Sequence, residues 1–456
     1  MTEIQNTLTV KIEKLLYEGF ALARANDFPI FIENACVDDE VEIEITKKNK
    51  RYATGKIIKF IKESNKRVKP FCALHNVCGG CQWQYIEYNE QLKQKENIVR
   101  ETIEKITGKN IKILPIIASP KQIEYRHKVQ YPVSQTKVSK RIMAGYYKKN
   151  SHELVNIKFC PIQPLDINDI IEKIKLKAQE LNITAYNEKK HSGTLRHIVI
   201  KNSDFYKQNL IIFVINSETI PDSIKQLANH IFKTQNNIKG ICVNLNTKKG
   251  NAILSDRTVC IEGDGYYLEK IKNTSYKISS NSFFQVNPHS AEKMLEIVKS
   301  IASTINNKPT VLDAYSGVAS FGIYLKDIAE EITCVEEIKS AHKDAIENIK
   351  INNANNVKAI NGNAAQIFEN FIKEKKQFDI VILDPPRKGC DKKAIDLVTN
   401  LAKDSIIYVS CNPATLARDL NYLQQQGFET EYIQPLDMFP HTYHIESIAL
   451  IKRVKE

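Results

Sequence analysis

Short apolar runs alternate with helical segments through the last third of the chain. The runs lie at 311–313, 332–336, 380–383 and 406–409 and are rich in β-branched residues. Runs of this kind are typical of strands buried on both faces, and their alternation with helices indicates a doubly wound parallel sheet. Open α/β sheets bind ligands at the carboxyl ends of their strands. We therefore expect a Rossmann-like α/β domain whose site follows these runs.

The first part of the chain has a different pattern. Residues 8–61 alternate in the manner of short strands, with turn signals at Gly19 and at Asp38-Asp39. This pattern predicts a small β-barrel, similar in kind to barrels that bind oligonucleotides.

The middle of the chain, from Cys72 to about Tyr276, is mixed. An amphipathic helix is expected over 88–105, and strand-like runs follow at 128–133, 198–201 and 209–214. The helix near 88–108 is expected to pack with the α/β domain that follows at 277–456. Three regions result: a barrel at 1–62, a mixed α/β central domain at 63–276 and an α/β domain at 277–456.

Composition sets the surroundings in which this chain works. Of its 456 residues 42% are apolar, no stretch is long enough to cross a membrane, and Met1 to Asn6 shows no signal peptide. We therefore expect a cytoplasmic protein without a membrane partner. Its ten cysteines are then expected to act as thiols, ligands or catalysts rather than as disulfides.

Positive charge is concentrated in one segment. Lys and Arg outnumber Asp and Glu by 65 to 53 overall, and residues 47–70 hold ten basic residues against one acid, Glu63. Such a run is either a solvated face or a surface for a phosphate-rich partner. RNA is the partner that we expect, with contacts from Lys50, Arg51 and Lys56.

Two motifs follow the third and fourth apolar runs. They are Asp384-Pro-Pro-Arg387 and Ser410-Cys411-Asn-Pro413. A lone cysteine after a strand is usually a core residue. Its position at the end of a strand, beside a second motif at the same sheet edge, favours a thiol nucleophile for Cys411 instead.

The first apolar run leads into a turn of small residues, Asp313-Ala-Tyr-Ser-Gly317. Backbone amides in such a turn can approach a ligand. Glu336 ends the next run, where a carboxylate can accept hydrogen bonds from two ribose hydroxyls, although a surface acid is the simpler alternative. The turn lacks the Gly-x-Gly-x-x-Gly fingerprint of NAD enzymes, so we expect S-adenosylmethionine, an adenosyl cofactor without a pyrophosphate.

A second set of cysteines has the spacing of ligands. The set consists of Cys72, Cys78 and Cys81, which are close in sequence, and of the distant Cys160. Together the four cysteines supply four thiolates for either a [4Fe-4S] cluster or a tetrahedral zinc. Spacing alone does not separate the two. The Cys-x3-Cys-x2-Cys pattern of radical-generating clusters is absent from the sequence, so the expected role is structural or RNA-positioning.

These motifs together resemble a known family over nearly the whole chain. The chain is similar to bacterial RNA uracil-5-methyltransferases of the iron-sulfur-containing 23S rRNA branch. Leu16-Tyr-Glu-Gly-Phe-Ala-Leu-Ala23 resembles the TRAM RNA-binding domain, and Ile278 to Pro288 resembles the entry to the methyltransferase domain. The resemblance favours the [4Fe-4S] cluster over zinc. It also implies cofactor contacts from Gln285, Tyr315, Glu336, Asn363 and Asp384.

The resemblance places the nucleophile at Cys411 and the general base at Glu446, within His441-Thr-Tyr-His-Ile-Glu446. Phe283 is then expected near the target base, and Arg126 in Tyr125-Arg-His-Lys128 is expected to contact RNA. Two residues depart from the family pattern: Ala319 replaces a common glycine, and His127 replaces a common asparagine.

The chemistry of uracil explains why one thiol and one carboxylate are needed. Carbon 5 becomes nucleophilic only after a thiolate adds to carbon 6, and the proton left on carbon 5 must then be removed by a base. The resemblance implies an enzyme that methylates carbon 5 of a uridine in 23S rRNA, and we expect it to be a monomer that needs no protein partner. The alternatives are a tRNA uracil-5-methyltransferase, a non-catalytic RNA-binding or assembly factor, and an amine methyltransferase that uses Asp384 to Arg387.

Overall fold

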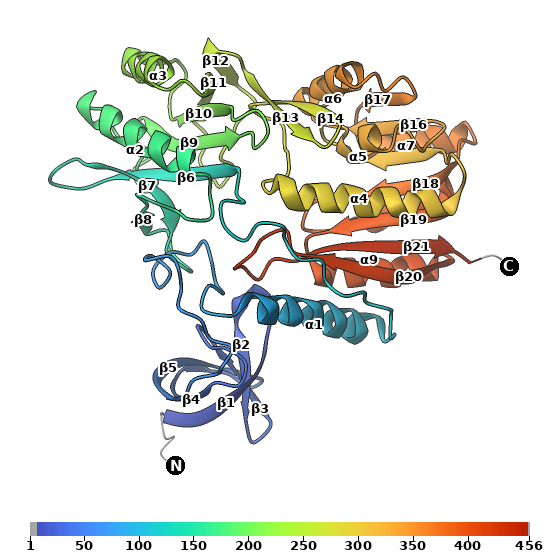
Figure 1. The fold of residues 1–456 in the computed structure, drawn as a ribbon, viewed down its shortest axis with the longest axis horizontal. Helices are drawn as coiled ribbons and strands as arrows, with labels where there is room; N and C mark the ends of the chain where they lie inside the picture. Colours follow the sequence, from blue (N-terminus) through green and yellow to red (C-terminus); the bar gives the residue numbers. More distant parts are fainter. Residues whose placement is uncertain (1–6, 455–456) are drawn as a thin grey trace.

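The computed structural model describes residues 7–454, and its strands form a closed barrel, a central sheet, a two-stranded hairpin and a catalytic sheet (Figure 1). The barrel lies at the end of the molecule that holds the N-terminus, and the two large sheets lie side by side beyond it. No helix in the described part of the chain is both long and apolar enough to cross a bilayer.

The barrel confirms the short-strand pattern at the start of the chain. Apolar side chains of alternate residues, such as Val10, Ile12, Val41 and Ile43, fill its interior. Its strands, in the order β1-β2-β3-β5-β4, are β1 (Thr7–Leu15), β2 (Ala21–Ala25), β3 (Phe28–Ile32), β4 (Glu40–Lys48) and β5 (Ala53–Lys62).

The basic segment at 47–70 spans the end of β4, the turn after it, β5 and the start of the irregular segment that follows. Antiparallel pairing with β4 sets Lys56 opposite Glu44 and Lys59 opposite Glu42. Directly opposite residues share a face of the sheet, so these acids offset part of the charge that the linear count suggests. Lys50 and Arg51 lie in the exposed turn between the strands and have no such partner in the β4 ladder.

Residues 63–87 form an irregular segment that leads into α1 (Tyr88–Thr107), which Gly108 ends with a φ of 68°. α1 packs against α9 (Pro413–Gln425), a helix of the last third of the chain (Figure 1). Trp83, Ile98 and Val99 share one hydrophobic core with the barrel and with one face of the catalytic sheet. The barrel is therefore joined to the catalytic region through a common core.

The central region is a mixed seven-stranded sheet in the order β12-β11-β10-β9-β6-β7-β8. Two helices, α2 (Leu165–Glu180) and α3 (Asp222–Thr234), bury their apolar sides against it. Its strands are β6 (Lys128–Gln135), β7 (Ile142–Tyr147), β8 (Leu154–Asn156), β9 (Leu195–Asn202), β10 (Asn209–Ile215), β11 (Ile238–Leu245) and β12 (Thr258–Gly263).

A hairpin and a long helix connect the central and catalytic sheets. The hairpin consists of β13 (Tyr266–Ile271) and β14 (Thr274–Ser279), and α4 (Pro288–Ile305) follows a short loop. The loop between β14 and α4 lies where the two large sheets meet (Figure 1), and Phe283 and Gln285 belong to it.

The catalytic sheet has the order β17-β16-β15-β18-β19-β21-β20. Pairing is parallel from β17 to β19, which confirms the doubly wound pattern, and helices cover both faces. Its elements are β15 (Val311–Ala314), α5 (Ser320–Tyr324), β16 (Ile332–Glu336), α6 (Lys339–Ile351), β17 (Val357–Asn361), α7 (Ala364–Lys373), β18 (Phe378–Leu383), α8 (Lys392–Leu401), β19 (Ala402–Ser410), β20 (Phe428–Leu436) and β21 (Glu446–Arg453).

The last two strands depart from an all-parallel sheet. β21 inserts between β19 and β20 and runs antiparallel to both. Because an antiparallel strand starts where its parallel neighbour ends, Glu446 at the start of β21 lies at the carboxyl edge of the sheet.

Candidate active site and cysteine cluster

The register of the catalytic sheet brings several predicted residues to one edge. Ala314 pairs with Leu383, and Leu383 pairs with Tyr408, so the residues that follow these strands emerge together. Tyr315 and Asp384 are two of these residues, and Glu336 ends the neighbouring strand β16. The structure thus places these three at the edge where an open α/β sheet binds its ligand.

Cys411 and Glu446 meet through the antiparallel edge. Ser410 pairs with Ser447 in the β19–β21 ladder, so continuing that register by one residue sets Cys411 opposite Glu446. Cys411 is half-buried, whereas Glu446 is buried. A thiol and a carboxyl group from distant parts of the sequence therefore face the same space.

Burial and neighbouring charges determine the protonation of this pair. Burial, and next the charge of Glu446, raise the pKa of Cys411 to about 11, while Arg387 acts in the opposite direction. Burial also raises the pKa of Glu446 well above its usual range, and the charge of Asp384 adds to this effect. Glu446 is therefore a much stronger base than a carboxylate in water.

Two aspartates belong to the adjacent strands β15 and β18: Asp313 lies within β15, and Asp384 directly follows β18. Burial raises the pKa of Asp384 to about 7. Burial also raises the pKa of Asp313 to about 7, even though its Oδ2 accepts a hydrogen bond from the Gly322 amide at 3.1 Å. Asp313 Oδ1 is buried without a partner, which leaves an acceptor available to a bound ligand.

The turn after β15 has the shape of a cofactor cradle. Tyr315, Gly317 and Ala319 have φ values of 65°, 57° and 64°, which turn the backbone sharply between β15 and α5. Ala319 adopts the left-handed conformation that the family's common glycine would favour, at some cost in strain.

Glu336 lies against this turn. Its carboxylate accepts hydrogen bonds from the Gly317 amide at 2.8 Å and the Ile338 amide at 2.7 Å. Each oxygen keeps a free lone pair, so the group can still accept from two ribose hydroxyls. Together with the unpartnered oxygen of Asp313, this donor and acceptor set fits the adenosyl part of S-adenosylmethionine.

Three other predicted residues surround this edge. Asn363 caps α7, is exposed, and follows β17 by two residues. Gln285 is half-buried in the loop before α4, and Phe283 in the same loop is 57% exposed. The Lys128 ammonium lies 5.7 Å from the centre of the Phe283 ring, so this exposed aromatic surface already has a cationic neighbour.

Two residues of the site were not predicted. The Tyr17 hydroxyl, from the barrel, donates a hydrogen bond to the carbonyl of Cys411 at 3.1 Å. Arg387 is exposed, and its positive charge lowers the pKa of both Cys411 and Glu446. The position of Arg387 in the Asp-Pro-Pro-Arg motif was a usable signal, whereas no pattern around Tyr17 indicates contact with a residue 394 positions away.

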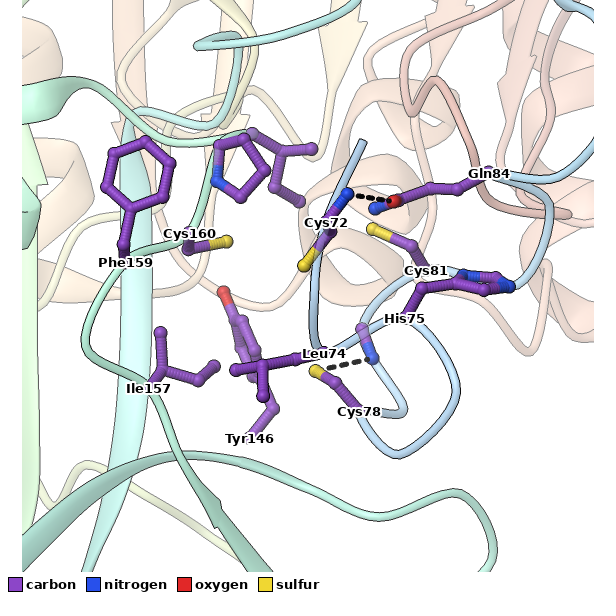
Figure 2. A pocket seen from close by; sticks show the side chains of 13 residues that line it. Cys72, Leu74, His75, Cys78, Cys81, Gln84, Tyr146, Ile157, Phe159 and Cys160 are labelled. Atoms are coloured by element: carbon purple, nitrogen blue, oxygen red, sulfur yellow. Dashed lines mark hydrogen bonds between the residues drawn. The ribbon is translucent and has the colours of Figure 1, made fainter. Parts of the chain in front are cut away.

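The second set of cysteines surrounds one pocket (Figure 2). Cys72, Cys78 and Cys81 come from the irregular segment after the barrel, and Cys160 comes from the segment before α2; their sulfurs point toward one another. Within the described residues, no three of these sulfurs lie within 4.8 Å of one another. Burial raises the pKa of Cys81 to about 12 and that of Cys160 to about 11.

Arg126 lies beside this pocket. Its guanidinium is 5.8 Å from the centre of the Tyr146 ring, and its charge lowers the pKa of Cys81 and Cys160. The Tyr146 hydroxyl is buried without a partner. Four thiols, one cation and one free hydroxyl around a common space fit an anionic metal-thiolate group.

The fold and this edge define the class of protein: an adenosyl-cofactor enzyme of the α/β type with an appended nucleic-acid-binding barrel. A family model described as tRNA (Uracil-5-)-methyltransferase matches residues 87–454, and one described as TRAM domain matches residues 2–58. The chain therefore belongs to the tRNA (uracil-5-)-methyltransferase family, and it is an S-adenosylmethionine-dependent RNA methyltransferase with a TRAM domain.

Relatives of similar length agree with this family. A protein of Clostridium acetobutylicum described as an uncharacterized RNA methyltransferase is 37% identical, covering 98% of this chain and 97% of the relative. One of Bacillus cereus with the same description is 34% identical over the same shares. The crystal structure of Pyrococcus abyssi tRNA (uracil-54, C5)-methyltransferase in complex with S-adenosyl-L-homocysteine is similar, with a TM-score of 0.76, 26% identity, and coverage of 97% of this chain and 100% of that one.

Proposed function

We propose that this enzyme methylates carbon 5 of a uridine in 23S rRNA, with Cys411 as the nucleophile and Glu446 as the general base. The observation that carries the chemistry is the position of Cys411 opposite Glu446 at the carboxyl edge of the sheet. An amine methyltransferase would have no use for a half-open thiol beside a buried carboxyl group. A non-catalytic assembly factor would need neither residue.

The reaction begins with the thiol of Cys411. Its raised pKa means that the free enzyme holds it protonated at neutral pH, and Arg387 provides the charge that favours the thiolate. Loss of the proton to solvent lets the sulfur bond to carbon 6 of uracil, and the displaced electron pair moves toward carbon 5 and the carbonyl oxygen. S-adenosylmethionine, when bound, supplies an electrophilic methyl group to carbon 5.

Glu446 completes the cycle. The proton that remains on carbon 5 passes to its carboxylate, the electron pair reforms the carbon 5–carbon 6 double bond, and the Cys411 sulfur leaves. Burial favours the protonated form of Glu446 in the free enzyme, so its own proton must first pass to solvent, a loss that the charge of Arg387 favours; the carboxylate that results is a stronger base than one in water. Gln285, Tyr315, Glu336, Asn363 and Asp384 are proposed to hold the cofactor.

The target base must leave its stack for carbon 6 to meet a thiol. Phe283 is exposed in the loop that reaches this edge, and we propose that its ring stacks on the uracil or on a neighbouring base. Lys50, Arg51, Lys56 and Arg126 are proposed to contact the RNA. RNA contact is better supported for Lys50 and Arg51 than for the other two, because Lys56 lies opposite Glu44 and Arg126 lies beside the cysteine pocket.

We propose a [4Fe-4S] cluster for the four cysteines. Tetrahedral zinc holds thiolates about 3.8 Å apart, given Zn–S bonds of about 2.3 Å. The four sulfurs are not gathered that tightly in the structure, and the resemblance of the chain to the iron-sulfur branch favours a cubane, in which each thiolate binds a different iron. The cluster would act structurally: the amides of Gln82 and Trp83, next to Cys81, both donate to the His441 carbonyl, at 3.0 and 2.9 Å, in the loop that leads to Glu446.

The choice of 23S rRNA over tRNA rests on the cysteine set. The barrel does not separate the two, because a tRNA methyltransferase structure aligns with 97% of this chain. Mapping 5-methyluridine by mass spectrometry in rRNA and tRNA from a deletion strain tests the proposal. Loss from one site in 23S rRNA, restored by the wild-type gene but not by a Cys411→Ala copy, is expected; loss from tRNA alone would favour the other substrate.

We further propose that the enzyme works as a cytoplasmic monomer. Tyr17, Arg387, Cys411 and Glu446 come from one chain, so the site needs no second copy. The proposed domain limits are 1–62, 63–276 and 277–456, with α1 packed on the catalytic domain.

A further inference from the structure

Two imidazoles and one carboxylate lie close together in a group that contains none of the four pocket cysteines. They belong to His127 at the start of β6, Asp204 in the turn between β9 and β10, and His289 in the first turn of α4. One ligand-type atom from each lies within 4.8 Å of the other two. We propose that these residues form a binding site for one divalent transition metal ion of the zinc type.

The distances suit such an ion. His127 Nε2 lies 3.7 Å from Asp204 Oδ1, and His289 Nε2 lies 3.2 Å from Asp204 Oδ2. Zinc bonds of about 2.1 Å to nitrogen and oxygen place tetrahedral ligands about 3.4 Å apart. The cluster therefore needs only a small closure to surround an ion, with a water as the fourth ligand.

The tautomer of His127 is the second observation. Its Nδ1 lies 2.7 Å from Asn202 Oδ1, an atom that only accepts, so Nδ1 carries the proton and Nε2 keeps a lone pair. His127 is only 5% exposed, and its Nε2 has no hydrogen-bond partner. A second group that orients the ring through its other nitrogen is the usual arrangement around a metal-binding histidine.

The remaining atoms agree with this assignment. His289 Nε2 is also buried without a hydrogen-bond partner, although it is close to Asp204.

Two lysines currently balance the charge of the carboxylate. Lys121 and Lys207 lie 3.6 and 3.4 Å from Asp204 Oδ1. Their side chains are 44% and 75% exposed, so both can turn toward solvent when an ion arrives. Asp204 and His289 are also partly open to solvent, which leaves an entry path.

The position of the site indicates a structural role for a bound ion. It joins the central sheet, through β6 and the β9–β10 turn, to the start of α4. The His127 amide donates to the Val286 carbonyl at 2.7 Å, in the loop that carries Phe283 and Gln285. A bound ion would fix this loop against the central sheet.

The test uses cobalt as a spectroscopic probe on the full-length protein with its cysteine site already filled. We expect one further equivalent of Co²⁺, with visible bands of nitrogen and oxygen ligation and without the charge-transfer band of thiolates. His127→Asn, which installs the residue common in the family, and His289→Gln should each weaken this binding at least about 100-fold. His342→Gln is the matched control and should bind as the wild type does.

Zinc stabilisation provides a second measurement that does not depend on the folding of any one variant. Zn²⁺ should raise the melting temperature of the wild type and of His342→Gln, but not that of His127→Asn or His289→Gln. Absence of a further cobalt equivalent in the wild type, a thiolate band in its spectrum, or undiminished binding by both histidine variants would each overturn the proposal.

Discussion

Cys411 and the four cysteines of the pocket are held in place by different parts of the fold. Cys411 directly follows β19, a strand that lies between β18 and β21 in a seven-stranded sheet. The register of these strands determines which residues lie near Cys411. Cys72, Cys78 and Cys81 lie in a segment without helix or strand, whose internal bonds are short turns such as Cys78 N to Leu74 O at 2.8 Å.

This difference separates two ways of building a thiol site. The edge of the sheet preorganises Cys411 and Glu446 before any ligand arrives. Burial raises the pKa of Cys78, Cys81 and Cys160 in the pocket, so these side chains are thiols without a bound metal, and the metal must displace their protons as it binds. We therefore expect substitutions at the sheet edge to change chemistry, and substitutions at the pocket to change stability first.

Replacement of the nucleophile gives the sharpest test of the first half of this comparison. Cys411→Ala should lower methyl transfer by more than about 10⁴-fold, because the first bond never forms. No covalent RNA adduct should form, while the melting temperature stays near that of the wild type. Single-turnover transfer of labelled methyl groups and a denaturing gel measure both. Residual transfer above one thousandth of the wild-type rate would show that another group attacks carbon 6.

Glu446→Gln separates the two catalytic roles. Addition and methyl transfer should proceed, but elimination should slow by about 10²–10⁴-fold, because no base removes the proton from carbon 5. A methylated covalent protein–RNA complex should then accumulate as a gel shift that survives denaturant. Release of free 5-methyluridine RNA at the native rate would show that the proton leaves by another route.

The sequence predicted β15, β16, β18 and β19 of the catalytic sheet because these strands are buried on both faces, whereas it missed the parallel edge strand β17, which is largely open to solvent. The run at 380–383 became β18 and the run at 406–409 became β19, each extended by a few residues. β20 was not predicted, since charged residues such as Glu429 and Glu431 interrupt its apolar pattern. The insertion of β21 between β19 and β20 depends on contacts between residues far apart in the sequence, which no local pattern predicts.

For the candidate site, motif positions were predictable where a residue directly follows a strand, as Asp384 and Cys411 do. The contact of Tyr17 with Cys411 was not, because it depends on how the barrel docks on the catalytic sheet. The cross-strand glutamates opposite Lys56 and Lys59 were also missed, since a charge count along the chain ignores pairing in space.

Loss of a pocket cysteine tests the second half of the comparison. Anaerobically purified wild-type protein should be brown and hold about four irons per chain. Cys78→Ala or Cys81→Ala should lose them and melt at a lower temperature, with a smaller loss of activity than Cys411→Ala shows. Cys36→Ala, in the buried core of the barrel, is the control that should keep its iron. Stoichiometric zinc without iron in the wild type would contradict the cluster.

The rate of alkylation of Cys411 tests how neighbouring charges set the pKa of its thiol. Because its pKa is raised to about 11, the thiolate fraction, and hence the rate of reaction with iodoacetamide, should rise about tenfold per pH unit from pH 7 to 9. Arg387→Gln should slow alkylation at pH 8, since the lost positive charge raises the pKa further. Glu446→Gln should accelerate it, and Arg387→Lys should stay near the wild type. Peptide mass spectrometry measures each rate. Equal rates in Arg387→Gln and Glu446→Gln would show that these two charges do not shift the pKa of Cys411.

The smallest effect is expected at the basic turn and strand β5 of the barrel, for which we propose contacts with RNA phosphates. Joint replacement of Lys50, Arg51 and Lys56 by glutamine removes at most three phosphate contacts, so the salt dependence of binding should flatten by about 0.7 per lost contact. Affinity should fall for all RNA sequences alike, because phosphate contacts position rather than specify. Glu44 already offsets Lys56, so Lys56→Gln alone should change the slope less than Lys50→Gln or Arg51→Gln. An unchanged slope in the triple variant would mean that this face of the barrel is merely solvated, and that RNA binding depends on the regions around the thiols instead.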